Sequence, residues 1–350
     1  KVTQSVFNFH PISINDIEKE IKSLNSKKST ISGSIPVKSL KENLDITGKI
    51  LHEIFSNSII DCEFPDNLKL AEITPIFKAS DRTNKKNYRP ISVLSGISKI
   101  FERILGNQMT DYVDRFLYKY MFGYRKGYST QHALLTLLEK WKISLEKGGY
   151  AAALIMDLSK AFDTINHDLL LAKMNAYGFS REALLLIKSY LSNRWYRTNV
   201  NGSYSTWQEL FDGVPQGSIL GPLLFNIYFN DLFFFFEYTE ASNYADDTDL
   251  YACDIYLEDL LYKLEHDAHI AIEWFESNYM KLNEDKCHFL ITGNKYEHIF
   301  LNVGSEKIWE SSDVKILGIN VDSHLKFKAH GESVLKEAGK KLSVIARMSN

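Results

Sequence analysis

The stretch that decides the fold is NYADDTDLY, Asn243–Tyr251. Apolar and polar residues alternate on both sides of the adjacent acids Asp246 and Asp247, which predicts a short β-hairpin with two carboxylates at its turn. Two unit charges about 4 Å apart repel by roughly 4 kcal/mol at an effective dielectric constant of 20, so adjacent carboxylates are typical of a cation site. A solvated turn is the alternative interpretation, because Asp is a common turn residue.

Another acid directly follows the pattern of a buried strand earlier in the chain. The segment Ala151–Met156 is an uninterrupted apolar run that ends at Asp157. Such a run is typical of a strand that is buried on both faces. If this strand lies beside the predicted hairpin, Asp157 converges with Asp246 and Asp247. Carboxylate oxygens are the ligands that Mg²⁺ prefers, so the sequence predicts a Mg²⁺ site at this point.

The overall charge of the chain does not indicate nucleic-acid binding. The 350 residues carry a formal net charge of −3 with a pI near 6.4, so any surface for nucleic acid has to be a local patch. Basic residues cluster in Lys78–Arg89 and again at Arg125 and Lys126, in a loop rich in glycine and tyrosine. Ordinary solvated charge is the alternative interpretation of both clusters.

The cysteine pattern and the lack of long apolar runs argue against several classes of protein. Cys62, Cys253 and Cys287 are not spaced like a disulfide framework or a zinc site, which favours a reducing compartment. No signal peptide is recognisable, and no apolar run approaches the roughly 18 residues of a membrane span, so no membrane partner is expected. Because the chain starts at Lys1 rather than Met, we expect it to be part of a longer protein.

Hydrophobic periodicity and turn residues predict the remaining elements. Helices are expected after the caps Ser13, Thr130 and Ser180, and over Ile46–Ile60, Ser95–Met109, His167–Tyr177, Arg181–Leu191, Val214–Asp231 and Leu257–Asn278. Expected strands are an edge strand at Ala71–Lys78, whose Pro75 suits an edge, a hairpin at Arg197–Leu210, and strands at Phe289–Thr292 and Lys315–Val321. Strands and helices in this irregular order favour the α+β class.

The acidic segments belong to a larger set of motifs that follow one another along the chain. The long motifs are DLSKAFDTINH at Asp157–His167, GVPQGSILGPLLFN at Gly213–Asn226 and YADD at Tyr244–Asp247. The shorter ones are Asn87–Ser92, Phe122–Arg125, Leu282–Leu290 and the pair Leu317-Gly318. This ordered set resembles the reverse transcriptase domain of non-LTR retrotransposons, of the LINE type and similar to the jockey elements.

The resemblance implies an α+β fold of the right-hand polymerase type, with a ferredoxin-like palm, helical fingers and a truncated thumb. It places an N-terminal helical extension of the fingers at residues 1–60 and the fingers at 61–150. The palm is expected at 151–322, with a fingers-like insertion at 179–205, and the start of the thumb at 323–350. An intracellular protein of the nucleus and cytoplasm is expected from the same resemblance.

For catalysis, the resemblance implies that Asp157, Asp246 and Asp247 hold two Mg²⁺ ions, with Mn²⁺ as an alternative metal. The backbone carbonyl of Leu158 is expected to assist as a further ligand. Lys286 corresponds to a lysine that protonates the leaving pyrophosphate, and an ordinary solvated lysine is the alternative. These ions would activate the primer 3′-hydroxyl and neutralise the triphosphate during in-line phosphoryl transfer.

For nucleotide binding, the resemblance implies that Lys78 and Arg89 clamp the triphosphate, because a guanidinium matches phosphate oxygens bidentately. Gln216 and Gly217 are expected to line the nucleotide pocket, where a glycine lets the backbone come close. Phe162 corresponds to the bulky residue that excludes a ribose 2′-hydroxyl. The alternative for Phe162 is an ordinary core aromatic.

The implied function is RNA-directed DNA polymerisation, in which a DNA primer is extended on an RNA template with deoxyribonucleoside triphosphates (dNTPs) during retrotransposition. One alternative is an intron-type maturase reverse transcriptase, which shares the YADD motif. Another is an inactive nucleic-acid-binding relic of a mobile element, against which the intact acids argue. The sequence contains no indication of the oligomeric state.

Overall fold

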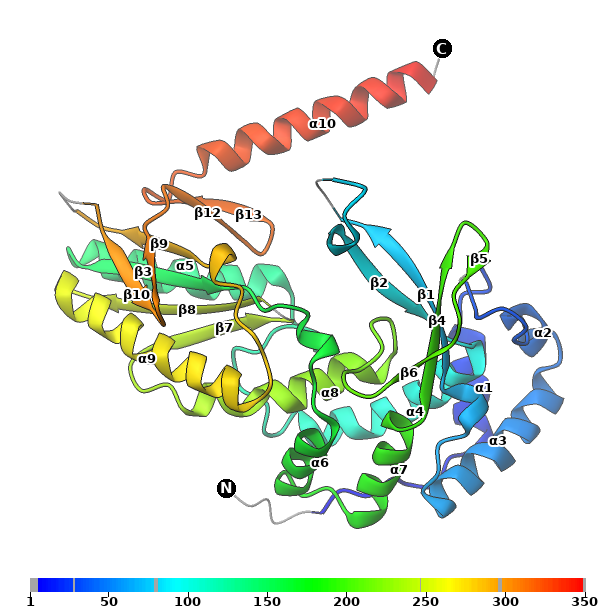
Figure 1. Ribbon diagram of the computed structural model, residues 1–350. Helices are drawn as coiled ribbons and strands as arrows, with labels where there is room; N and C mark the ends of the chain where they lie inside the picture. The colour runs from blue at the N-terminus through cyan, green and yellow to red at the C-terminus, as the bar shows by residue number, and fades with distance from the viewer. Residues whose placement is uncertain (1–5, 28, 79–80, 246, 295–297, 349–350) are drawn as a thin grey trace. The chain divides into compact units, whose positions relative to one another are not determined.

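The computed structural model describes residues 6–27, 29–78, 81–245, 247–294 and 298–348 (Figure 1). The chain forms two compact units, each assembled from two separate stretches of sequence. The first unit contains residues 1–117 and 160–230, and the second contains residues 118–159 and 231–350. Helices and strands are mixed in both units, which confirms the predicted α+β class.

The second unit is built on an antiparallel sheet in which the predicted buried strand is central. The strand order is β7 (Glu240–Tyr244), β8 (Asp247–Asp254), β3 (Tyr150–Met156) and β9 (His288–Thr292). The side chains from Ala151 to Leu154 are fully buried, so both faces of β3 are covered. Helices α5 (Thr130–Glu146) and α9 (Leu257–Ser277) pack on this sheet. The apolar run of β3 is therefore explained by burial on both faces.

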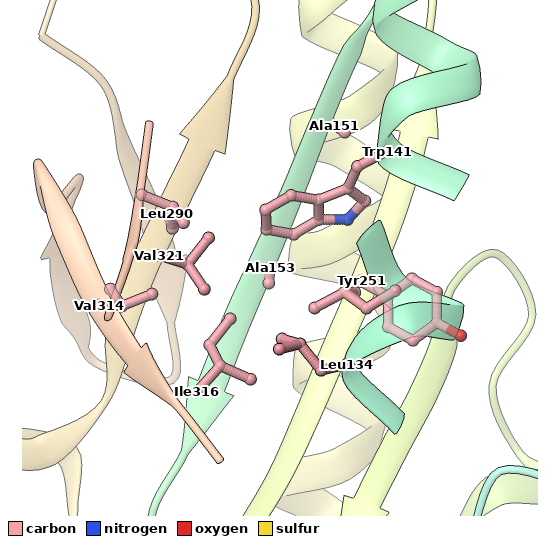
Figure 2. Packing of buried hydrophobic residues seen from close by; sticks show 10 residues of the cluster. Leu134, Trp141, Ala151, Ala153, Tyr251, Leu290, Val314, Ile316 and Val321 are labelled. Carbon is pink, nitrogen blue, oxygen red and sulfur yellow. The ribbon is translucent and has the colours of Figure 1, made fainter. Parts of the chain in front are cut away.

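One hydrophobic core cluster joins α5, the sheet and a small hairpin, β12 (Asp313–Ile316) and β13 (Ile319–Asp322). The indole of Trp141 lies against β3 beside Ala151 and Ala153, whose methyl groups leave room for it (Figure 2). The other members of the cluster are Leu134, Leu137, Tyr251, Leu290, Val314, Ile316 and Val321. Close packing of this kind fixes α5 and the small hairpin on the same face of the sheet.

Two hairpins near the end of the second unit were not foreseen correctly. The predicted single strand Lys315–Val321 is the hairpin β12–β13, because Leu317 (φ 48°) and Gly318 (φ 88°) form a turn with two left-handed residues. A second hairpin, β10 (Phe300–Val303) with β11 (Glu306–Trp309), was missed. Helix α10 (Lys328–Met348) follows, and none of its described residues is buried.

The first unit contains a mixed sheet that corrects one prediction. Its order is β2 (Tyr88–Val93), β1 (Leu70–Phe77), β4 (Arg194–Val200) and β5 (Ser203–Tyr204), and β6 (Gln208–Leu210) also pairs with β4. The predicted edge strand β1 is an inner strand, since β4 pairs with it in parallel. That pairing ends at Ile73, so Pro75 lies beyond it and interrupts no hydrogen bond to β4.

The first unit also contains helices, and serine caps start several of them. They are α1 (Ile14–Ser23), α2 (Val37–Glu42), α3 (Leu44–Asp61), α4 (Gly96–Val113), α6 (His167–Ala176), α7 (Arg181–Leu191) and α8 (Leu220–Phe229). Ser13, Ser95 and Ser180 cap α1, α4 and α7, as in the predicted starts. The cap of α5 in the second unit is Ser129 and not Thr130, because the Ser129 hydroxyl accepts from the His132 amide.

Short 3₁₀ turns complete the chain, namely η1 (Asp66–Leu68), η2 (Lys85–Asn87), η3 (Ala161–Asp163), η4 (Asn230–Phe234) and η5 (Glu284–Lys286). The sequence analysis did not predict helix α2, because six residues are too few to show a clear helical periodicity. In the part of the chain that the structure describes, no helix is long and apolar enough to cross a membrane.

Candidate active site

The second unit brings two of the predicted acids together. Strand β3 runs antiparallel to β8 with Met156 opposite Thr248, so Asp157 and Asp247 occupy the next positions at the same end of the sheet. Both line a cavity of about 270 Å³. The predicted convergence is confirmed for this pair, whereas Asp246 lies outside the described residues. Their role as metal ligands stays a prediction.

The donor set at this end of the sheet fits a hard cation. Carboxylates at Asp157 and Asp247 and the carbonyl of Leu158 are all oxygen donors, which Mg²⁺ prefers. Leu158 is buried and pairs with Leu282 in an isolated bridge, so the backbone after Asp157 is fixed. Within the described ranges, which omit Asp246, no group of three or more His, Cys, Asp or Glu side chains is arranged as a metal site.

Asp157 is held from one side by the turn around η5. The Lys286 ammonium lies 3.2 Å from Asp157 Oδ2, and the Asn283 side-chain amide donates to the same oxygen at 3.2 Å. The Asn283 backbone also donates to the Asp157 carbonyl at 2.8 Å. These contacts bring Lys286 to the predicted site, although its side chain remains 57% exposed. The role of Lys286 as a proton donor to the leaving pyrophosphate stays a prediction.

A further acid, Asp249, lies on the same face of β8 as Asp247. Its side chain is 3% exposed, and burial together with the nearby Asp247 charge raises the pKa of Asp249 to about 8. Near neutral pH this carboxyl is therefore mostly protonated, which limits the negative charge gathered beside Asp247.

Three more polar residues line the same cavity and were missed by sequence reasoning. His288 lies opposite Ile155 on the neighbouring strand β9, and Asp313 and Lys315 come from β12. The alternation of exposed Asp313 and Lys315 with buried Val314 was a usable signal for one polar face. The sequence analysis did not predict the β12–β13 hairpin, which brings this face to the cavity.

In the first unit, the predicted triphosphate clamp lies on the β1–β2 hairpin. Ile76 pairs with Arg89, and the amide of Lys78 donates to the Asn87 carbonyl at 2.8 Å. Because side chains of paired residues point to the same face and alternate along each strand, Lys78 and Arg89 share one face of the hairpin. Two cations so placed can bind an anion together, and their role stays a prediction.

Gln216 and Gly217 lie in a turn that precedes α8, which corrects the predicted helix Val214–Asp231. The Gln216 carbonyl accepts from the Ser92 amide at 2.6 Å. Gly217 has φ +117°, and a Cβ there would lie 2.6 Å from the Ser92 carbonyl oxygen. The positive φ excludes helical backbone at Gly217, and α8 begins only at Leu220.

A buried acid that the sequence did not single out caps the start of α8. Glu102 on α4 is fully buried and accepts from the amides of Ile219 and Leu220 at 2.7 and 3.2 Å, and from the Ser98 hydroxyl. A carboxylate at a helix N-terminus satisfies amides that lack intrahelical partners. Glu102 thereby anchors the end of the turn that carries Gln216.

Phe162 lies in η3 with one ring face packed against α8. Its ring stacks on Phe225 with centroids 4.7 Å apart and planes 15° apart, and its carbonyl accepts from the Val214 amide at 2.9 Å. The residue is only partly buried. Next to it, Asp163 accepts from the Gln216 side-chain amide at 3.1 Å, and burial raises the pKa of Asp163. The predicted nucleotide residues Phe162 and Gln216 are therefore linked through Asp163.

Comparison with known proteins assigns most of the chain to one family. A family model described as "Reverse transcriptase (RNA-dependent DNA polymerase)" matches residues 76–321. The chain is 29% identical to "Probable RNA-directed DNA polymerase from transposon BS" of Drosophila melanogaster, over 97% of this chain and 39% of that protein. It is 27% identical to "RNA-directed DNA polymerase from mobile element jockey" of the same species, over 97% of this chain and 38% of that protein.

A third relative covers less of the chain. It is the "Putative COX1/OXI3 intron 1 protein" of Saccharomyces cerevisiae, 29% identical over 41% of this chain and 16% of that protein. The chain spans about two fifths of the length of the two Drosophila relatives.

Proposed function

Because the chain belongs to the reverse transcriptase (RNA-dependent DNA polymerase) family, we propose that it extends a DNA primer on an RNA template with dNTPs. The proposed biological role is retrotransposition of a non-LTR element, in keeping with the names of the Drosophila relatives that match along nearly the whole chain. The observation that carries the proposal is the pairing of β3 with β8, which sets Asp157 beside Asp247 at one end of a buried sheet.

The proposed architecture is a right hand. In it, the antiparallel sheet β7-β8-β3-β9 is the core of a ferredoxin-like palm at residues 151–322, with a fingers-like insertion at 179–205. Residues 1–60 and 61–150 form the helical extension and the fingers, and 323–350 begin the thumb. Helix α10 (Lys328–Met348) lies within this last range, and none of its described residues is buried.

The proposed metal site consists of Asp157, Asp247, the Leu158 carbonyl and Asp246, the last of which lies outside the described residues. This oxygen set suits two Mg²⁺ ions, with Mn²⁺ as a substitute. Bound ions of this kind lower the pKa of the primer 3′-hydroxyl and neutralise charge on the triphosphate. The contact between Lys286 and Asp157 supports a role for that lysine in giving a proton to pyrophosphate.

In the proposed reaction, the primer 3′-oxygen attacks the α-phosphorus in line, and the bond to the pyrophosphate oxygen breaks as the new phosphodiester bond forms. Lys78 and Arg89 bind the triphosphate from one face of their hairpin. Gln216 and Gly217 line the nucleotide pocket, and Phe162 excludes a ribose 2′-hydroxyl. The proposed location is the nucleus and cytoplasm.

Two other functions remain as competing proposals. An intron-type maturase is disfavoured by the comparisons, since the intron-encoded relative aligns with a much smaller part of the chain. An inactive relic predicts no extension by any variant. Against it stand the acids on β3 and β8 and their supporting contacts, which are intact.

The proposed function is tested by primer extension on an RNA template with Mg²⁺, using the full-length open reading frame. Asp247→Asn removes one ligand charge and should lower the extension rate by at least about 100-fold, because charge stabilisation of the transition state is lost. The matched control is Asp259→Asn, an exposed acid in the first turn of α9, which should extend at the parent rate. Normal extension by Asp247→Asn would refute the assignment.

A further inference from the structure

The segment Tyr120–Gly123 lies along the outer edge of β7, the last strand of the sheet in the second unit. The Asn243 amide donates to the Tyr120 carbonyl at 3.1 Å, and the Phe122 amide donates to the Asn243 carbonyl at 2.8 Å. Met121 faces Asn243 in a parallel bridge, and both Met121 and Phe122 are buried. This segment therefore pairs like a short strand with the end of β7, directly before the turn between β7 and β8.

Gly123 touches the backbone of that turn. A Cβ at Gly123 would lie 2.3 Å from the Ala245 nitrogen, closer than real Cβ contacts come, and 3.1 Å from the Ala245 Cα. The neighbours are backbone atoms, which yield only if the turn itself moves. Ala245 has φ +61°, a left-handed conformation that costs a non-glycine residue about 1 kcal/mol or more, so surrounding contacts have to hold it.

Asn243 holds the same turn from inside the hairpin. It is fully buried, and its side-chain nitrogen lies 3.0 Å from the Ala245 carbonyl oxygen and 3.3 Å from the Asp247 carbonyl oxygen. The same nitrogen also lies 3.0 Å from the Thr248 hydroxyl. One amide group thus ties together the residues that precede and follow Asp246 in the sequence.

The loop that carries Gly123 is itself closed by Arg125. The guanidinium donates to the carbonyls of Tyr118 and Met121 at 3.3 and 3.2 Å, and it lies 4.4 Å from the ring centroid of Tyr128. Arg125 therefore has an internal structural use, in contrast to the solvated or nucleic-acid-facing charge that the sequence suggested. These contacts fix the backbone from Tyr118 to Arg125, which contains Gly123.

We propose that Tyr120–Gly123 is a brace for the β7–β8 hairpin at Ala245 and Asp247, with Gly123 and Asn243 as positioning residues. The brace sets the Asp247 carboxylate where phosphoryl transfer needs it, and a displacement of about 1 Å at such a site can cost about 100-fold in rate. This inference rests on the proposed function. It assigns the Phe122–Arg125 motif to the geometry of the acids and not to contact with nucleic acid.

The test is Gly123→Ala in the full-length protein, compared with Gly48→Ala in helix α3. At Gly48 the nearest atom to a Cβ is on the Glu18 side chain at 3.3 Å, which can move aside. We expect Gly123→Ala to lower kcat by about 10- to 100-fold and to raise the Mg²⁺ concentration for half-maximal rate, with the KM for dNTP unchanged. The control should match the parent in all three.

Binding of Mn²⁺, followed by electron paramagnetic resonance, separates this inference from the proposed polymerase activity. Gly123→Ala should bind Mn²⁺ at least about 10-fold more weakly than the parent, whether or not the parent extends a primer. If the parent binds Mn²⁺ but extends nothing, the proposed function fails and the brace is still tested. Parent-like kcat and Mn²⁺ affinity in Gly123→Ala would overturn the brace.

Two further variants keep the test decisive. Ala245→Gly removes the strain of the left-handed conformation at residue 245. Added to Gly123→Ala, it should therefore restore the rate or the Mn²⁺ affinity by at least about 3-fold. No recovery would contradict the proposed brace. Asn243→Ala removes the internal amide and serves if Gly123→Ala does not fold. It should weaken Mn²⁺ binding in the same way, and parent-like binding would contradict the proposal.

Discussion

At the scale of single residues, Phe162 is where the choice between deoxyribose and ribose is expected to lie. The ring rests on Phe225 and stays partly exposed. A gate acts by steric clash, so Phe162→Val should raise the ratio of kcat/KM for a ribonucleotide to that for its deoxy counterpart by at least about 10-fold. The control is Phe211→Val, a residue of the same unit that is 73% exposed.

If Phe162 is instead a core aromatic, its truncation should lower the free energy of unfolding and leave the preference for deoxyribose unchanged. Truncation of a core Phe to Ala costs about 3–5 kcal/mol of unfolding free energy. An unchanged sugar ratio together with such a loss in Phe162→Ala would return the side chain to the core. The preference for DNA synthesis would then depend on other residues.

Asp163, next to Phe162, predicts a pH dependence of stability. Burial raises its pKa in the folded protein above the value of the unfolded chain, although Gln216 and Lys160 oppose this. The folded protein thus keeps a proton that the unfolded chain releases, and stability falls as pH rises from the unfolded pKa through the folded pKa. Each unit of difference is worth about 1.4 kcal/mol.

Asp163→Asn cannot ionise but keeps the shape of the protonated acid, so it should flatten this decline. The free energy of unfolding, measured in urea from pH 4 to pH 7, should fall less in the variant than in the parent. Exposed Asp168, substituted in the same way, is the control. Parallel curves for Asp163→Asn and the parent would show that burial does not shift this carboxyl.

At the scale of elements, the β1–β2 hairpin carries Lys78 and Arg89 on one face. Hydrogen bonds to charged groups contribute about 1.5–3 kcal/mol, so Arg89→Ala should raise the KM for dNTP by roughly 10- to 100-fold. Affinity for primer–template should stay the same. Arg82→Ala removes an equal charge from the same hairpin, where Arg82 lies over Phe77, and serves as the control. The reverse pattern would make Arg89 a nucleic-acid contact.

Helix α5 is fixed to the sheet of the second unit largely through Trp141, which is fully buried beside the alanines of β3 (Figure 2). Trp141→Ala should lower the free energy of unfolding by about 3–5 kcal/mol, because a large cavity remains beside short side chains. Trp309, in the same unit and 53% exposed, is the matched control and should lose about 1 kcal/mol or less. Urea unfolding followed by circular dichroism measures both.

At the scale of the whole molecule, the chain passes from one compact unit to the other near residues 117, 159 and 230. The second of these crossing points follows the motif that begins at Asp157. The third follows helix α8, which comes after Gln216. The predicted nucleotide residues Lys78, Arg89, Phe162, Gln216 and Gly217 belong to the first unit. Asp157, Leu158, Asp247 and Lys286 belong to the second. The order of motifs along the chain therefore differs from their grouping in the fold.

The sequence by itself determined the features that depend on neighbours along the chain. The apolar run of β3, the alternation in β7 and β8, and the serine caps of α1, α4 and α7 follow from local periodicity and from unpaired helix amides. The acids Asp157 and Asp247 were predicted to converge for the same reason, since each sits at the end of a recognisable strand.

Only the tertiary structure decided the features that depend on contacts between distant segments. The parallel pairing of β1 with β4, the cap that Glu102 supplies to α8 and the approach of Gly123 to Ala245 each join residues far apart in the chain. The local sequence pattern carries no information on such pairs, because a buried glycine or acid has the same neighbours along the chain whether or not a distant segment contacts it. Gly217 shows this most directly: its φ of +117° keeps α8 from starting before Leu220, although apolar periodicity alone predicted a start at Val214.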